Sequence, residues 1–315
     1  MASKNVYEIV TDRVIEELQK GRIPWQRPWV CVGKGYGLAV SHTNGKPYSL
    51  LNQLILGKPG EYLTWNQVQK EGGKVKKGAK AGMVCFWKML PVDKTDADGK
   101  PVVDEKTGET KKKLVPFLRY YNVFHIEDVD GVKAKYADKT QVPATVNEAM
   151  EKAGIHEGAE AVLHGYIDRE GITFEEEESS EAYYSPAADL LHLPLRSQFE
   201  KTAEYYSTAF HEATHSTGHK SRLDRLTTGR AAAFGGSDYS KEELVAELGA
   251  ASICHSLGIE TESSFKNSVA YIQSWLKALR NDPRMVVTAA SKAEKAVARI
   301  FGEQDTAEAD EAAEA

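Results

Sequence analysis

The segment AFHEATHSTGHKSRLDR at residues 209–225 constrains the fold more than any other part of the sequence. It contains the pattern His-Glu-x-x-His, with His211 and His215 four positions apart. Residues at this spacing lie one turn apart on the same face of an α-helix, so both imidazoles can bind one metal ion. The pattern therefore predicts a helix from about Lys201 to Thr217 with a metal site on one face.

Glu212 follows the first histidine directly and is rotated away from the metal position. A carboxylate at this offset suits the general base that accepts a proton from water in metal-dependent hydrolysis. Glu212 is therefore the predicted catalytic residue. A zinc site also needs a third protein ligand. Metzincins supply a histidine six positions after the second one, but Ser221 occupies that position here, so a glutamate ligand fits better.

A second helix is predicted to begin at Ser240, an N-cap residue with Glu243 three positions later. Glu243 and Glu247 share one face of this otherwise apolar segment. A carboxylate on the core side of a helix is costly unless it is paired or bound to a metal. We predict Glu243 as the third ligand and Glu247 as a residue that orients a ligating histidine. The sequence leaves the reverse assignment open.

The predicted ion is Zn²⁺, and another divalent metal such as Mn²⁺ is the alternative. The opposing interpretation is a polar helix that spells the motif by chance, but the acidic residues on the apolar face of the next helix argue against it. Peptide hydrolysis is a claim separate from metal binding. After the first helix, His219, Arg222 and Arg225 predict a solvated basic turn, with contacts to substrate as the alternative.

The charge of the chain is divided unevenly, although the net charge is only −6. Residues 1–140 contain 24 Lys and Arg against 16 Asp and Glu, whereas the remainder contains 16 against 30. The simplest interpretation is two domains with different functions. We predict domains at 1–140 and 141–301, a linker over residues 136–146, and a disordered acidic tail at 302–315.

The N-terminal half combines aromatic and basic residues. Four of the five tryptophans lie there, and residues 58–88 contain seven lysines against two glutamates. Lysines that follow phosphates and aromatic rings that stack on bases are typical of single-stranded nucleic-acid binding. The alternative is that the tryptophans fill a core and the lysines only solvate its surface. The predicted DNA-binding residues are Trp25, Arg27, Trp29, Trp65, Lys74, Lys76, Lys77, Lys80, Trp87 and Lys88.

Apolar and aromatic runs predict two strands, MVCFWKML and LRYYNVFHIEDV. The charged, turn-rich segment between them predicts a flexible loop at about residues 92–113. No apolar run approaches the ~20 residues that span a membrane, and the N-terminal segment has helical spacing rather than the apolar run of a signal peptide. We therefore expect a cytoplasmic protein without a membrane partner. The fold class expected is α+β, with an N-terminal α/β domain and a mainly helical C-terminal domain containing a small sheet.

Five segments occur in a specific order: GRIPWQRPW, YLTWNQVQKEGGKVKKGAKAGMVCFW, YYNVFHIEDVDG, HEATHSTGHKSRLDR and YSKEELVAELGAA. In these segments the chain resembles ArdC-type antirestriction proteins of conjugative plasmids from residue 5 to about 300, and related N-terminal regions occur in plasmid TraC primases. The resemblance implies an N-terminal domain that binds single-stranded DNA and a C-terminal zincin-like metallopeptidase domain. It places the metal on His211, His215 and a glutamate of EELVAE.

The resemblance also implies a function, the protection of incoming plasmid DNA from host restriction during conjugation. The protein would then be carried into the recipient cell with the DNA, and a host restriction-related protein would be its peptide substrate. The alternative is a protein that only coats single-stranded DNA, with a structural or regulatory metal and no peptidase activity. A weaker hypothesis is a primase accessory factor.

Overall fold

The computed structural model describes residues 5–26, 37–95, 100–102, 110–136, 152–226, 237–259 and 269–303. Helices and sheets are mixed along the chain, so the α+β class predicted from the sequence is confirmed. None of the described helices is both long and apolar enough to cross a membrane.

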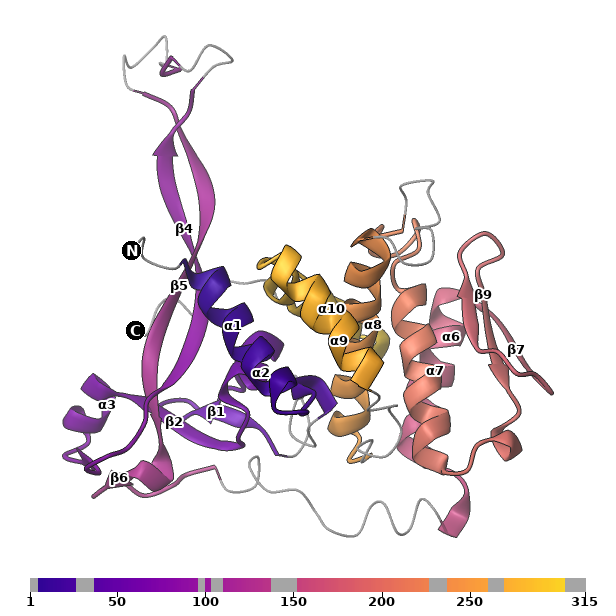
Figure 1. The fold of residues 1–315 in the computed structure, drawn as a ribbon, viewed down its shortest axis with the longest axis horizontal. Helices are drawn as coiled ribbons and strands as arrows, with labels where there is room; N and C mark the ends of the chain where they lie inside the picture. Colours follow the sequence, from indigo (N-terminus) through magenta and orange to yellow (C-terminus); the bar gives the residue numbers. More distant parts are fainter. Residues whose placement is uncertain are drawn as a thin grey trace.

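The N-terminal half contains a four-stranded sheet of order β1-β2-β5-β4, in which only the β1–β2 pair is parallel. β3 and β6 form a short ladder of their own, and Figure 1 shows β6 beside the four-stranded sheet. The elements are α1 (Val6–Gln19), η1 (Pro24–Gln26), β1 (Ala39–Ser41), α2 (Leu50–Leu56), β2 (Gly60–Thr64), α3 (Trp65–Lys70), β3 (Lys74–Val75), β4 (Gly82–Asp93), β5 (Lys112–His125), η2 (Ile126–Asp128) and β6 (Val129–Asp130).

The two strands predicted in this half are present, and both extend further toward the hairpin than expected. The second ends at His125, so its predicted continuation through Ile126–Asp128, which form η2, was wrong. β4 and β5 pair continuously from Gly82 opposite Val123 to Asp93 opposite Lys112. The predicted loop at about 92–113 was therefore too long at both ends. Its charged residues looked like loop residues in the sequence, but a two-stranded ribbon with solvent on both sides accommodates charged side chains within its strands.

The C-terminal half contains a three-stranded sheet of order β7-β9-β8, with β7 parallel and β8 antiparallel to β9. Helices α6 and α7 share a hydrophobic core with this sheet. The elements are α6 (Glu157–Glu170), β7 (Thr173–Glu177), β8 (Tyr183–Ser185), β9 (Leu190–Pro194), η3 (Arg196–Gln198), α7 (Thr202–Ser216), α8 (Ser237–Ser256), α9 (Val269–Asn281) and α10 (Met285–Phe301). α8 begins at Ser237, so the predicted start at Ser240 was wrong.

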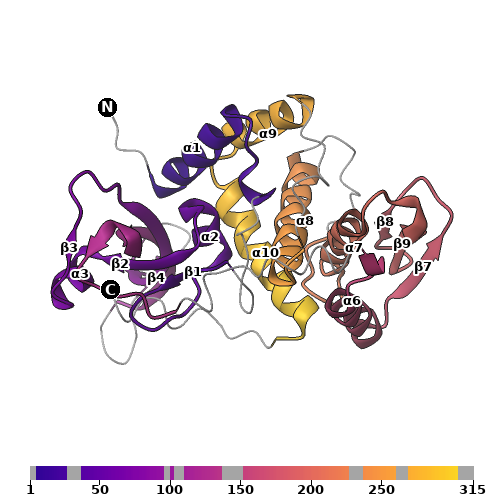
Figure 2. The same ribbon diagram turned by 90° about the horizontal axis from the view of Figure 1, so that it is seen from below.

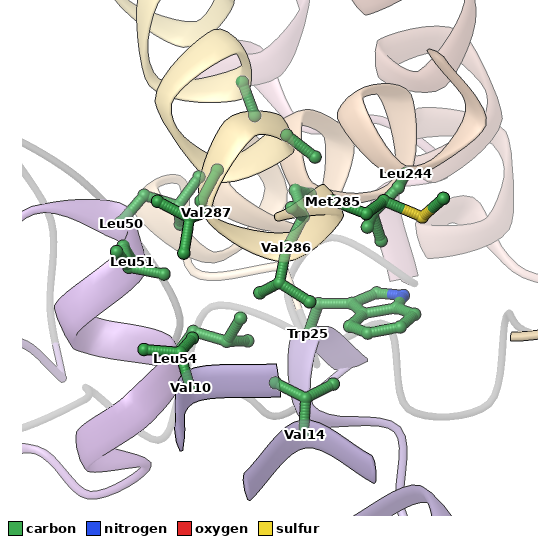
Figure 3. Packing of buried hydrophobic residues seen from close by; sticks show 14 of the residues in the cluster. Val10, Val14, Trp25, Leu50, Leu51, Leu54, Leu244, Met285, Val286 and Val287 are labelled. Carbon is green, nitrogen blue, oxygen red and sulfur yellow. The ribbon is translucent and has the colours of Figure 1, made fainter. Parts of the chain in front are cut away.

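The largest hydrophobic cluster joins the two halves. Residues of α1 and α2 pack in it against residues of α8 and α10, and Figure 2 shows α1 lying along α9. Trp25 is only 1% exposed and meets Trp275 edge-on, with ring centroids 5.5 Å apart. Figure 3 shows the Trp25 ring in the same cluster as Leu244 and Met285. The N-terminal segment thus contacts the helix that carries the predicted third metal ligand.

Candidate metal centre and nucleic-acid surface

α7 places the His-Glu-x-x-His motif on a regular helix, as the sequence predicts. Most of the helix is buried, and its large apolar side chains, Tyr205, Tyr206 and Phe210, lie in the core shared with the small sheet. His211 and His215 remain partly exposed on one side. Burial of the other faces fixes the orientation of the helix, so the two imidazoles are held in place by the core.

α8 lies close against α7 because a glycine of α8 faces α7. A Cβ atom added at Gly249 would lie 2.6 Å from Thr214 Cγ2 and 2.7 Å from Thr214 Oγ1. Such distances are too short for a side chain, so only glycine permits this approach of the two helices. The approach brings the first turns of α8, with Glu242 and Glu243, opposite the histidines of α7.

Three side chains converge on one point. Nε2 of His211 and Nε2 of His215 are 3.1 Å apart, and Glu243 carboxylate oxygens lie 3.6 Å and 3.4 Å from these two atoms respectively. Two ligand atoms of one tetrahedral zinc ion, each ~2.0–2.1 Å from the metal, are roughly 3.3 Å apart. The spacing of the three donors and their nitrogen and oxygen chemistry therefore fit a single divalent cation.

A carboxylate that the sequence reasoning missed lies behind His215. Glu242 Oε1 is 3.6 Å from His215 Nδ1, the ring nitrogen that faces away from the other two donors. Arg225 holds this carboxylate through Nη2 at 2.8 Å and Nε at 3.3 Å, and also donates to Thr217 Oγ1 and the carbonyl of Thr214. Arg225 thus ties Glu242 to the C-terminal end of α7.

The electrostatics of the cluster favour a cation. Burial alone would lower the pKa of His215, but the carboxylates of Glu242 and Glu243 raise it to about 10. Burial would raise the pKa of Glu243, but His211 and His215 hold it well below its ordinary value. Burial would likewise raise the pKa of Glu242, and His215 and Arg225 lower it. The carboxylates remain charged and attract positive charge to the point where the imidazoles meet.

The two other predicted site residues are also near this point in the fold. Glu212 is 9% exposed, and its negative charge acts on His215. Glu247 is buried on α8, one turn after Glu243. It lies outside the group of three donors that could hold an ion among the described residues. Its orienting role stays a prediction.

The basic turn after α7 is not solvated, and this prediction was wrong. The Arg222 side chain is almost fully buried and forms a two-pronged ion pair with Asp189, which also accepts a hydrogen bond from Tyr184 OH at 2.7 Å. Arg225 is buried against Glu242. The two arginines therefore fasten the segment after the motif to β8, to the β8–β9 turn and to α8. A basic residue count cannot reveal this, because the partners are distant in the sequence.

The predicted DNA-binding residues divide into three groups. Trp25 is buried in the shared core, so its ring is not accessible to a base, and its prediction as a DNA-binding residue was wrong. Arg27 and Trp29 lie outside the described residues. The remaining seven are exposed: Trp65, Lys74, Lys76, Lys77, Lys80, Trp87 and Lys88. Trp65 starts α3, and Trp87 lies on β4.

Two family models match separate parts of the chain. The model of the N-terminal domain of anti-restriction factor ArdC matches residues 4–124. A zincin-like metallopeptidase model matches residues 161–292, which include α7 and α8. These matches confirm a two-domain architecture of an ArdC N-terminal domain and a zincin-like C-terminal domain.

Solved structures match nearly the whole chain. The metal-free crystal structure of the antirestriction ArdC protein from plasmid R388 is 31% identical, with a TM-score of 0.69 and coverage of 96% of this chain and 100% of that one. The chain belongs to the ArdC family of antirestriction proteins. The Mn(II)-bound structure of R388 ArdC is also similar, at 30% identity and a TM-score of 0.67, with 95% and 98% of the two chains covered. The resemblance predicted from the sequence motifs is confirmed.

Other relatives of this ArdC family member differ greatly in length. The uncharacterized protein y4eC of Sinorhizobium fredii is 33% identical over 315 residues, which cover 98% of this chain and 95% of that protein. Two DNA primases TraC of Escherichia coli are each 35% identical over 93% of this chain. The matched region spans only 19% and 26% of those primases.

Proposed function

We propose that this protein binds single-stranded DNA through its N-terminal half and hydrolyses peptide bonds at a divalent-metal site in its C-terminal half, so that incoming plasmid DNA is protected from host restriction. The observation that carries the enzymatic part is the convergence of His211, His215 and Glu243 on one ion-sized point beside Glu212. The Mn(II)-bound structure of the R388 relative supports the binding of a divalent ion by this protein.

Each residue of the proposed site has a separate chemical role. His211, His215 and Glu243 would hold Zn²⁺ or Mn²⁺, and such an ion supplies Lewis acidity toward the peptide carbonyl. Glu212 accepts a proton from the attacking water and returns it to the leaving amine. Glu242 and Arg225 hold the His215 ring in the orientation that presents Nε2 to the ion.

The DNA-binding part is supported by charge and by the match to the ArdC N-terminal domain. Lys74, Lys76, Lys77 and Lys80 are exposed within one short segment, and cations on such a surface release counterions from a DNA backbone. Replacing Lys76, Lys77 and Lys80 by Gln should weaken binding to an oligothymidine. The slope of log affinity against log salt should fall by up to about 2 units, at ~0.7 per phosphate contact on a single strand. An unchanged slope would place the DNA elsewhere on the surface.

The Glu212→Gln variant distinguishes protection by proteolysis from protection by coating of DNA. The variant keeps the three donors, so metal content should equal that of wild type, whereas peptide hydrolysis should fall by about 10²–10⁴-fold with loss of the general base. Transfer of a plasmid that carries restriction sites into a restricting recipient reports protection. Our proposal requires protection to be lost in Glu212→Gln. Full protection by this variant would instead mean that DNA is protected by occupancy and that the metal has a structural or regulatory role.

A further inference from the structure

The outer part of the β4–β5 ribbon has no neighbouring strand. β2 pairs with β5 only at Val123–His125, and β4 is the last strand of the sheet. From Met83 opposite Asn122 to Asp93 opposite Lys112, the two strands pair only with each other. Figure 1 shows this ribbon reaching away from the rest of the molecule. Its side chains therefore have little protein to pack against.

Large apolar side chains are nevertheless concentrated on it. Eleven large hydrophobic residues are exposed among those the structure describes. Seven lie on this ribbon: Trp87, Met89, Val92, Leu114, Val115, Phe117 and Tyr120. An exposed apolar surface of this extent marks an interaction site, because nothing else offsets the cost of contact with water.

The two faces of the ribbon differ in charge. Residues directly opposite each other share a face, and faces alternate along each strand. One face, called the basic face below, contains Phe86, Lys88, Leu90, Val92, Lys113, Val115, Phe117, Arg119 and Tyr121. The other contains Trp87, Met89, Pro91, Asp93, Lys112, Leu114, Leu118 and Tyr120. The basic face has three cations and no carboxylate, whereas the other has Asp93 and meets α1 where Trp87 contacts Tyr7.

Rings and cations alternate on the basic face. Phe86 and Tyr121 stack with centroids 4.2 Å apart, and the Arg119 guanidinium lies 5.8 Å from the centre of the Phe117 ring. Phe117 is 51% exposed and has Lys88 directly opposite. Successive positions of one face are ~6.6 Å apart along a strand. The face is thus an extended track of aromatic and positively charged groups.

The cations of this track are available to a ligand. Lys88, Lys113 and Arg119 form no ion pair with any other described residue, and all three are exposed. In contrast, Lys76 donates to the carbonyl of Glu127 and lies 3.7 Å from Asp130. A polyanion on the ribbon would therefore not compete with acidic neighbours.

We infer that the basic face of the β4–β5 ribbon is a binding track for single-stranded DNA, with Phe117 stacking on a base and Lys88, Lys113 and Arg119 contacting phosphates. The inference rests on the proposed DNA-binding function and adds a second contact surface to the lysine segment at residues 74–80. A single strand fits better than a duplex, because only unpaired bases offer their faces to an exposed ring. Trp87 points to the other face, so its predicted contact with DNA is not part of this track.

A matched pair of double variants tests the track. Phe117→Ser/Lys113→Gln removes a ring and a cation from the basic face. Leu114→Ser/Lys112→Gln removes an apolar residue that is at least as exposed, and a cation, from the opposite face, one to three positions away. Fluorescence anisotropy with a labelled oligothymidine and with a labelled duplex hairpin measures affinity over a salt series. Circular dichroism and metal content verify that the full-length variants are folded.

The basic-face variant should lose about 10- to 100-fold in affinity for oligothymidine, from one stacked base and one phosphate contact. The opposite-face variant should stay within about 2-fold of wild type, and binding to the hairpin should be weaker than to the single strand for all proteins. Absence of single-strand binding by wild type would refute the proposed function itself. Binding by wild type with equal affinities for both variants would refute only the track. Loss of self-association by the basic-face variant in sedimentation, at unchanged DNA affinity, would identify a second copy of the chain as the occupant and overturn our inference.

Discussion

Glu242 and Glu243 are adjacent in the sequence but face different atoms of the histidines. Glu243 faces both Nε2 atoms, whereas Glu242 faces Nδ1 of His215 and is held by Arg225. The His-Glu-x-x-His spacing predicted the histidines because their separation along a helix is fixed. It could not predict Glu242, because that contact depends on where the turn containing Arg225 folds back.

Replacing Glu242 by Gln should weaken metal binding without removing a ligand. The imidazole of His215 would lose the charged partner that orients it, a change that typically costs about 10–100-fold in metal affinity. Competition with a fluorescent zinc chelator measures the change, and Glu204→Gln in the first turn of the same motif helix is the control. An affinity equal to that of wild type would mean that Glu242 only pairs with Arg225.

At the scale of elements, the site depends on how closely α7 and α8 approach. The sequence predicted both helices but misplaced the start of α8, and nothing in it showed that Gly249 meets Thr214. A glycine inside a helix normally indicates a position that destabilises the helix. The role of this glycine can be recognised only when the facing helix is known. In the same way, the extension of β4 and β5 into the predicted loop depends on the pairing of the two strands with each other.

Gly249→Ala should therefore damage the metal site from a distance. The added methyl group would meet Thr214 at 2.6 Å, so the helices must separate, at a cost of about 1–3 kcal/mol. The free energy of unfolding measured in urea and the affinity for zinc should both decrease. Gly165→Ala on α6 is the matched control, because an added Cβ there meets nothing within 4 Å, and it should stabilise the protein by about 0.5–1 kcal/mol. Equal effects of the two variants would contradict the account.

At the scale of the whole molecule, the N-terminal and C-terminal halves share one hydrophobic core. Composition and charge predicted two halves, and the family matches support two domains. Aromatic content alone could not separate Trp25, which packs with Leu244 next to a predicted ligand, from Trp65, which is 52% exposed. The proline-tryptophan segment at residues 24–25 supports α8 instead of lining a DNA surface.

Trp25→Ala should destabilise the protein by about 3–5 kcal/mol and also lower zinc affinity, because α8 loses its support beside Glu243. Trp25→Phe should retain most of the stability and most of the zinc affinity. Trp65→Ala, at an exposed site, should change stability by less than about 0.5 kcal/mol. Thermal unfolding of the metal-free proteins and zinc titration measure the two effects separately. Normal zinc affinity in a folded Trp25→Ala protein would show that the halves are structurally independent at the metal site.

The most direct test of the central claim is calorimetric titration of the metal-free protein with Zn²⁺ and Mn²⁺, repeated for His211→Ala, His215→Ala and Glu243→Gln. One ion should bind per wild-type chain, and each replacement of a donor should abolish that binding event while the variants remain folded by circular dichroism. Retention of wild-type stoichiometry and affinity in any folded variant of the three would contradict the proposed centre.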